Sequence, residues 1–192
     1  MRQKNQKSLV LTRNREIILD KFYDVISKDS VRARNLIKRL DFRNDPYLLQ
    51  CIAQTYLDES RFNEDGTQRE YVEQRKWRMA ERYIIKAFEL NPDCLIVLST
   101  MGSTRKSSDQ NDIAIYCFER IIQLGVKAAK GYQYGLNPSL ASELVNDAKF
   151  ELYRLYYEKD KKQAEKYLNS YKKGLKKGVT TMFIPLDRFL LD

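Results

Sequence analysis

Few residues in this sequence have the types and spacing that catalysis or metal binding requires. The chain contains no histidine, so a serine or cysteine nucleophile lacks its usual general base, and zinc and haem lack a common ligand. The adjacent carboxylates Glu64 and Asp65 are followed by Gly66, which predicts a turn rather than a catalytic pocket. We therefore expect a protein that is not an enzyme and that holds no cofactor or metal.

Two further stretches resemble chemical motifs only in part. Residues 102–107, GSTRKS, end in the Lys-Ser of a phosphate-binding loop but lack its second glycine and a preceding strand. Cys117 lies between Tyr116 and Phe118, where a core position is a better interpretation than a nucleophile. The three cysteines are odd in number and show no C-x-x-C spacing, which favours a reducing, cytoplasmic compartment.

The chain has a basic excess, with 35 Lys and Arg against 26 Asp and Glu and a formal net charge of +9. Such a charge favours an acidic protein, a nucleic acid or an anionic lipid without choosing among them, and it also fits an ordinary solvated surface. The 13 tyrosines offer rings for stacking on bases, although most recur at helical core spacing. The excess is concentrated near the two ends, in Arg2, Lys4, Lys7, Arg13, Arg15, Lys159, Lys161, Lys162, Lys166, Lys172, Lys173, Lys176 and Lys177.

No stretch of the sequence approaches the ~20 apolar residues that a membrane-spanning helix needs. The basic N-terminal region holds only a short apolar segment, Leu9 to Leu11, which is too short for the core of a secretory signal. We therefore expect no membrane partner and a cytoplasmic location.

Apolar residues recur at helical spacing along most of the chain and predict an all-α protein. Asn137 followed by Pro138 predicts a helix start, and Gly125 predicts a helix end. Thr67 followed by Glu70 has the spacing of a capping box, which predicts a long helix from about Gln68 to Leu90. The expected helices begin near residues 15, 30, 46, 68, 95, 112, 138 and 162.

An internal repeat runs through the stretch from Trp77 to Gly125. Small and large apolar positions of one helix recur 34 residues later in another helix, and further matching positions lie in the helices that precede each of them. The recurring residues are Ala80, Ile84, Ala87 and Pro92, which match Ala114, Phe118, Ile121 and Val126, with Leu49, Ile52, Ala53 and Tyr56 and then Leu98, Met101 and Gly102 in the preceding helices.

These residues resemble the 34-residue consensus of the tetratricopeptide repeat (TPR) family, and the resemblance extends weakly over residues 15 to 177. It implies a right-handed α-solenoid of about four antiparallel helix pairs. The expected layout is a flexible basic arm over residues 1–14, a TPR-like domain over 15–178 with inserts near 58–76 and 126–140, and an apolar capping tail over 179–192.

The resemblance also implies a non-enzymatic scaffold or adaptor that binds a protein or peptide along a concave groove. Gln50 and Gln54 stand where a chaperone-binding subtype has Lys and Asn, which argues against that subtype. The tyrosine-containing loop between Gly131 and Gly135 is a further expected contact. The predicted contacts are Tyr47, Gln50, Gln54, Ile96, Ser99, Ser103, Lys106, Asn146, Lys149, Tyr153 and Tyr157 in the groove, and Tyr132 and Tyr134 in the loop.

The basic charge favours an acidic partner for this groove, which the protein would join to other molecules or neutralise. Two alternatives stay open at this point. The groove residues are equally compatible with ordinary exposed helix positions, and the basic ends are compatible with an RNA-associated helical-repeat protein.

Overall fold

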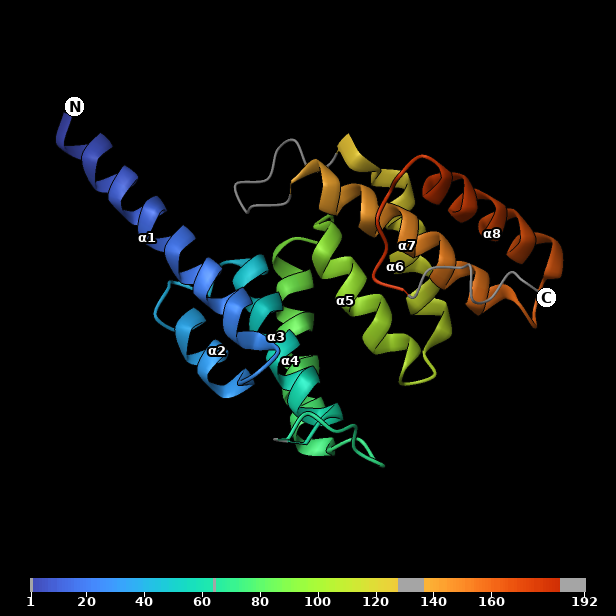
Figure 1. Ribbon diagram of the computed structural model, residues 1–192, viewed down its shortest axis with the longest axis horizontal. Coiled ribbons are helices and arrows are strands. Elements are labelled where there is room, and N and C mark those ends of the chain that lie inside the picture. The colour runs from blue at the N-terminus through green and yellow to red at the C-terminus, as the bar shows by residue number, and fades with distance from the viewer. Residues whose placement is uncertain (1, 64, 128–136, 184–192) are drawn as a thin grey trace. The chain divides into compact units, whose positions relative to one another are not determined.

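The computed structural model describes residues 2–63, 65–127 and 137–183, with side chains in the first helix from residue 13 onward. The described residues form eight α-helices and no β-sheet, so the predicted all-α class is confirmed (Figure 1). Their one strand-like feature is an isolated antiparallel bridge between Phe62 and Gln68. The chain divides into an N-terminal unit, residues 1–90, and a C-terminal unit, residues 91–192.

The N-terminal unit contains helices α1 (Arg2–Ile26), α2 (Ser30–Ile37), α3 (Pro46–Arg61) and α4 (Gln74–Leu90). Each helix packs against the next along the chain, and α3 lies between α2 and α4. Side-chain caps set two of the starts, because Asp29 accepts a hydrogen bond from the Arg32 N–H and Asp45 accepts from the N–H groups of Tyr47 and Leu48.

Helix α1 begins at Arg2, so the expected helix start near Arg15 is wrong. The residues that we expected to form a flexible arm belong to the same helix as the apolar residues that follow them. This stretch is rich in Arg, Lys, Gln and Leu and holds no Gly or Pro, so its intrinsic helix propensity is high even without an apolar stripe. The apolar pattern missed this start, whereas intrinsic helix propensity would have predicted it.

Helix α4 begins at Gln74, so the expected start at Gln68 is also wrong. Thr67 does not cap a helix, because its hydroxyl and its N–H both donate to Asp65 within a tight turn. The connection is held on α3 by backbone hydrogen bonds, one of which runs from the Glu73 N–H to the carbonyl of Ser60. The long predicted helix was expected to bury Tyr71, which is instead 78 % exposed.

A cluster of charged groups joins α2, α3 and α4 inside the N-terminal unit. The Arg34 guanidinium donates to both carboxylate oxygens of Glu59, at 3.0 and 2.9 Å, and Lys76 Nζ lies 2.9 Å from the same carboxylate. Arg34 also stacks over the Tyr56 ring at 3.9 Å and is only 6 % exposed. Burial by itself would raise the pKa of Glu59, but the hydrogen bonds and charges of Arg34 and Lys76 outweigh burial and lower this pKa.

We predict that Glu59→Gln destabilises the N-terminal unit by about 3 kcal/mol, because it leaves the Arg34 charge buried without its counterion. The carboxylate contributes its full stabilisation above its ordinary pKa of 4.5, and this contribution is lost as the pH falls below that value. Urea unfolding followed by the fluorescence of Trp77, the chain's one tryptophan, measures this unit at neutral and at acidic pH. The difference between variant and wild type should shrink on acidification, and the exposed control Glu89→Gln should match wild type. Equal stability of Glu59→Gln and wild type at neutral pH would contradict the prediction.

The C-terminal unit contains helices α5 (Leu95–Lys106), α6 (Asn111–Leu124), α7 (Pro138–Tyr156) and α8 (Lys161–Lys176). Helices α5 and α6 form one pair and α7 and α8 another, and α7 also contacts α6 and α5. Two expected boundaries are confirmed: Asn137 caps α7 by accepting from the Leu140 N–H at 2.8 Å, and α6 ends at Gly125, whose φ is 62°.

Small residues allow the paired helices of the C-terminal unit to approach closely. A Cβ atom at Gly102 of α5 would lie 2.8 Å from the Phe118 ring of α6, and one at Gly174 of α8 would lie 2.1 Å from the Asn146 side chain of α7. Ala114 is fully buried in the same region. The predicted role of Gly102 and Ala114 as close-approach positions agrees with this packing.

We predict that Gly102→Ala destabilises the C-terminal unit by about 1–3 kcal/mol, because overpacking against Phe118 exceeds the ~1 kcal/mol gain in helix propensity. Phe118→Leu in the Gly102→Ala background should recover part of the loss by making room. Thermal unfolding followed by circular dichroism measures both effects. Ser103→Ala, one residue later and half-buried, is the control and should change stability little. A stabilised Gly102→Ala variant would show that the two helices separate without cost.

Candidate functional site

The predicted groove residues of α3 do not form an open surface. Tyr47 is 4 % exposed and shares a hydrogen bond with the hydroxyl of Tyr23 on α1, and Gln50 is 6 % exposed. Gln54 is half-buried and donates to Asp58 at 2.9 Å. We expected Tyr47 and Gln50 to contact a partner directly, but both side chains are buried. The reason is that α3 is the central helix of its unit, so most of its residues are covered.

In the C-terminal unit, by contrast, the predicted residue Lys106 contacts a second helix through residues that we did not predict from the sequence. Lys106 of α5 forms an ion pair with Glu151 of α7, and Arg154 lies 3.7 Å from the same carboxylate. Ser99 and Ser103 lie on α5, two turns and one turn before Lys106 respectively, and both are half-buried. Two cations therefore flank the Glu151 carboxylate where α5 and α7 meet.

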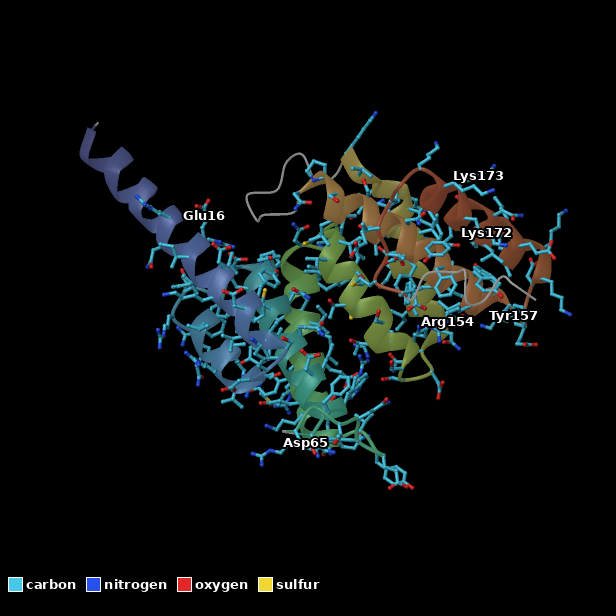
Figure 2. All side chains as sticks on the ribbon, viewed as in Figure 1. Glu16, Asp65, Arg154, Tyr157, Lys172 and Lys173 are labelled. Atoms are coloured by element: carbon cyan, nitrogen blue, oxygen red, sulfur yellow. The ribbon has the colours of Figure 1, made fainter. Side chains whose placement is uncertain are left out.

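Aromatic side chains continue this surface along α7. The rings of Phe150 and Tyr153 have centroids 5.8 Å apart, and those of Tyr153 and Tyr157 are 5.6 Å apart in an edge-to-face arrangement. Tyr157 is 51 % exposed, and Figure 2 labels it beside Arg154 near the end of α7. We use the term α7 face for Glu143, Asp147, Phe150, Glu151, Tyr153, Arg154 and Tyr157, which recur at spacings of three and four along this helix.

Two other predicted residues of α7 turn toward α8 instead. Asn146 is buried and donates to the backbone carbonyl of Tyr171 at 3.3 Å. Lys149 donates to the Asn146 side chain at 3.3 Å, and burial, with a smaller effect of the nearby Lys177 charge, lowers the pKa of Lys149. These two residues therefore support the α7–α8 pair and lie beside the α7 face.

Sequence reasoning missed Asp147, which holds the chain that follows α8. Its carboxylate accepts from the Thr181 hydroxyl at 2.5 Å and from the Met182 N–H at 2.9 Å, and the residue is 4 % exposed. Burial, together with the nearby charges of Glu143 and Glu151, outweighs these hydrogen bonds and raises the pKa of Asp147. The four-residue spacing of these three carboxylates was the sequence signal that could have located this stripe.

The N-terminal unit contains a cavity of about 850 Å³ beneath the turn that precedes α4. The carboxylates of Asp58 and Glu59 line it, but Asp58 accepts from Gln54 and Glu59 binds Arg34 and Lys76. Burial raises the pKa of Asp58 despite the hydrogen bond from Gln54. Asp58 is thus bonded within α3 and Glu59 joins α3 to α2 and α4, so both carboxylates already have partners.

A second surface feature is the row of lysines on α8. The helix contains a single acidic residue, Glu165. Figure 2 labels Lys172 and Lys173 on this helix. The exposed lysines of α8 and its C-terminal cap are Lys161, Lys162, Lys166, Lys173, Lys176 and Lys177.

The predicted loop contacts Tyr132 and Tyr134 lie outside the described residues, as does the tail after residue 183. In the described part of the chain, no helix is long and apolar enough to cross a membrane, and no group of three or more Cys, Asp or Glu side chains is placed to hold a metal ion. Comparisons with protein-family models, with curated proteins and with solved structures find no significant match for this chain.

Proposed function

We propose that this protein is a non-catalytic helical-repeat scaffold that binds an extended segment of another protein on the α7 face. One observation carries the proposal: an exposed guanidinium, an exposed tyrosine ring and a half-buried lysine from a second helix converge there. Arg154 is 52 % exposed, Tyr157 is 51 % exposed, and Lys106 reaches Glu151 from α5. Stacked first helices of successive pairs, as in a right-handed TPR-like solenoid, would present such a face on the concave side.

The chemistry of this face defines the partner segment. A guanidinium presents a planar set of donors that suits a carboxylate, and Arg154 shares Glu151 with Lys106, so its charge is not fully neutralised. The Tyr157 ring offers an apolar surface to an aromatic or aliphatic side chain. The expected ligand is a segment with an acidic residue next to an apolar one, and the net charge of +9 favours the approach of an acidic protein. In binding this partner, the present chain would act as an adaptor or would neutralise the partner.

We predict that selection of a displayed random-peptide library on the full chain enriches peptides that carry Asp or Glu beside an aromatic residue or leucine. Arg154→Ala and Tyr157→Ala should each weaken binding of an enriched peptide by about tenfold, as measured by fluorescence polarisation. Arg78→Ala and Tyr71→Ala remove exposed side chains of the same types from the N-terminal unit and should leave the affinity unchanged. The proposal is wrong if no peptide is enriched, or if the control variants lose as much affinity as the test variants.

The exposed lysines of α8 support a second candidate, binding of single-stranded RNA. Under this alternative, a mixed-sequence RNA should bind with an affinity that falls steeply as salt rises, because bound cations are released from the phosphates. Changing Lys173, Lys176 and Lys177 to Glu should abolish binding, whereas Lys86→Glu on α4 should have a small effect. Equal RNA affinity of the triple variant and wild type would exclude this candidate.

A further inference from the structure

The segment that follows α8 turns back and crosses α7 (Figure 1), and its contacts are those of a bound peptide. The Thr180 hydroxyl donates to Glu143. The Thr181 hydroxyl and the Met182 N–H both donate to Asp147. Because the contacts advance along α7 in the same order as along the segment, the chain follows the α7 face from its first turns toward its middle.

Thr181 is the centre of these contacts. Its hydroxyl donates to Asp147, and its oxygen accepts from the Tyr171 hydroxyl at 2.9 Å and from the Phe183 N–H at 3.1 Å. One donor and two acceptors are the full hydrogen-bonding capacity of a hydroxyl group. A valine of nearly the same shape could make none of these bonds, so the position selects for a hydroxyl residue.

Phe183 brings the segment to the aromatic row of the α7 face. Its ring centroid lies 4.8 Å from that of Phe150, which in turn leads to Tyr153 and Tyr157. The segment therefore occupies the first part of the same face on which we place the partner. A partner segment that continued past Phe150 would reach Arg154.

The segment covers its site and remains partly exposed, with Thr181 and Phe183 half-buried. Thr180 is exposed and Met182 is 64 % exposed, whereas Asp147 beneath them is 4 % exposed. Loss of the segment would uncover the Asp147 carboxylate and remove its hydrogen-bond donors. The nearby negative charges of Glu143 and Glu151 make an ionised Asp147 without donors unfavourable. A peptide that brings two hydroxyls, a backbone N–H and an aromatic ring supplies the same donors.

We propose that residues 180–183, Thr-Thr-Met-Phe, are an internal ligand of the α7 face, which a partner segment of the same chemistry displaces. This inference rests on the proposed function, because it assigns the partner to the same face. The partner is an extended segment with two adjacent Ser or Thr residues, an aromatic residue two positions after the second, and an acidic residue beyond it that reaches Arg154. Phosphorylation of either hydroxyl blocks binding, because a phosphate would face Glu143 and Asp147.

The test uses the full chain and a labelled synthetic peptide with blocked ends that has the sequence of residues 179–183, VTTMF. We predict that Thr181→Val in the protein increases its affinity for this peptide by about tenfold, because the resident segment no longer competes. Met182→Pro removes the backbone donor while keeping the hydroxyl, and it should act in the same direction. The control Thr67→Val removes a hydroxyl from the turn of the N-terminal unit and should leave the affinity at the wild-type level.

Two further measurements identify the site of binding. A peptide with both threonines replaced by valine should not bind the Thr181→Val protein, and adding Asp147→Asn to that protein should weaken binding of the VTTMF peptide. Equal affinity of wild type, Thr181→Val and Met182→Pro for the VTTMF peptide overturns the inference. In that case peptides from the library selection that depend on Arg154 would still support the proposed function. Conversely, the library selection could enrich no peptide while Thr181→Val still strengthens VTTMF binding. That outcome would contradict the proposed function and support only the assignment of residues 180–183 as an internal ligand.

Discussion

The close approach of paired helices is the constraint on which the candidate site depends. Gly174 places α8 so near α7 that the Asn146 side chain occupies the space of a Cβ atom, and Asn146 then donates to the Tyr171 carbonyl. The side chain of the same residue, Tyr171, donates its hydroxyl to Thr181. The absence of a side chain at Gly174 thus permits the close α7–α8 packing beside which the crossing segment lies.

Two carboxylates show how surroundings give the same chemical group opposite roles. Glu59 is enclosed by the cations Arg34 and Lys76, which lower its pKa and make it a structural joint between three helices. Burial raises the pKa of Asp147, and its charged neighbours are the carboxylates Glu143 and Glu151. Asp147 therefore depends on hydroxyl and N–H donors for its stabilisation, which is the property of a group that binds a chain segment.

Local signals in the sequence predicted most helices of the described chain, and the failures have local causes as well. Asn137 with Pro138 and Gly125 marked true boundaries, because capping and positive φ are properties of a few adjacent residues. Thr67 was misread because a capping box and a tight turn use the same residue types, and Asp65 supplied the competing acceptor. The start of α1 was missed because a polar helix has propensity without an apolar stripe.

The sequence by itself determined the helical class, most helix boundaries and the small residues Gly102 and Ala114, since these depend on spacing within one helix or its recurrence. Only the tertiary structure decided which side chains share a surface. It buried Tyr47 within a central helix, joined Lys106 to Glu151, and brought Thr181 onto Asp147. Contacts between residues so far apart in the chain depend on how helices cross, and the periodicity of a single helix carries no information about crossing.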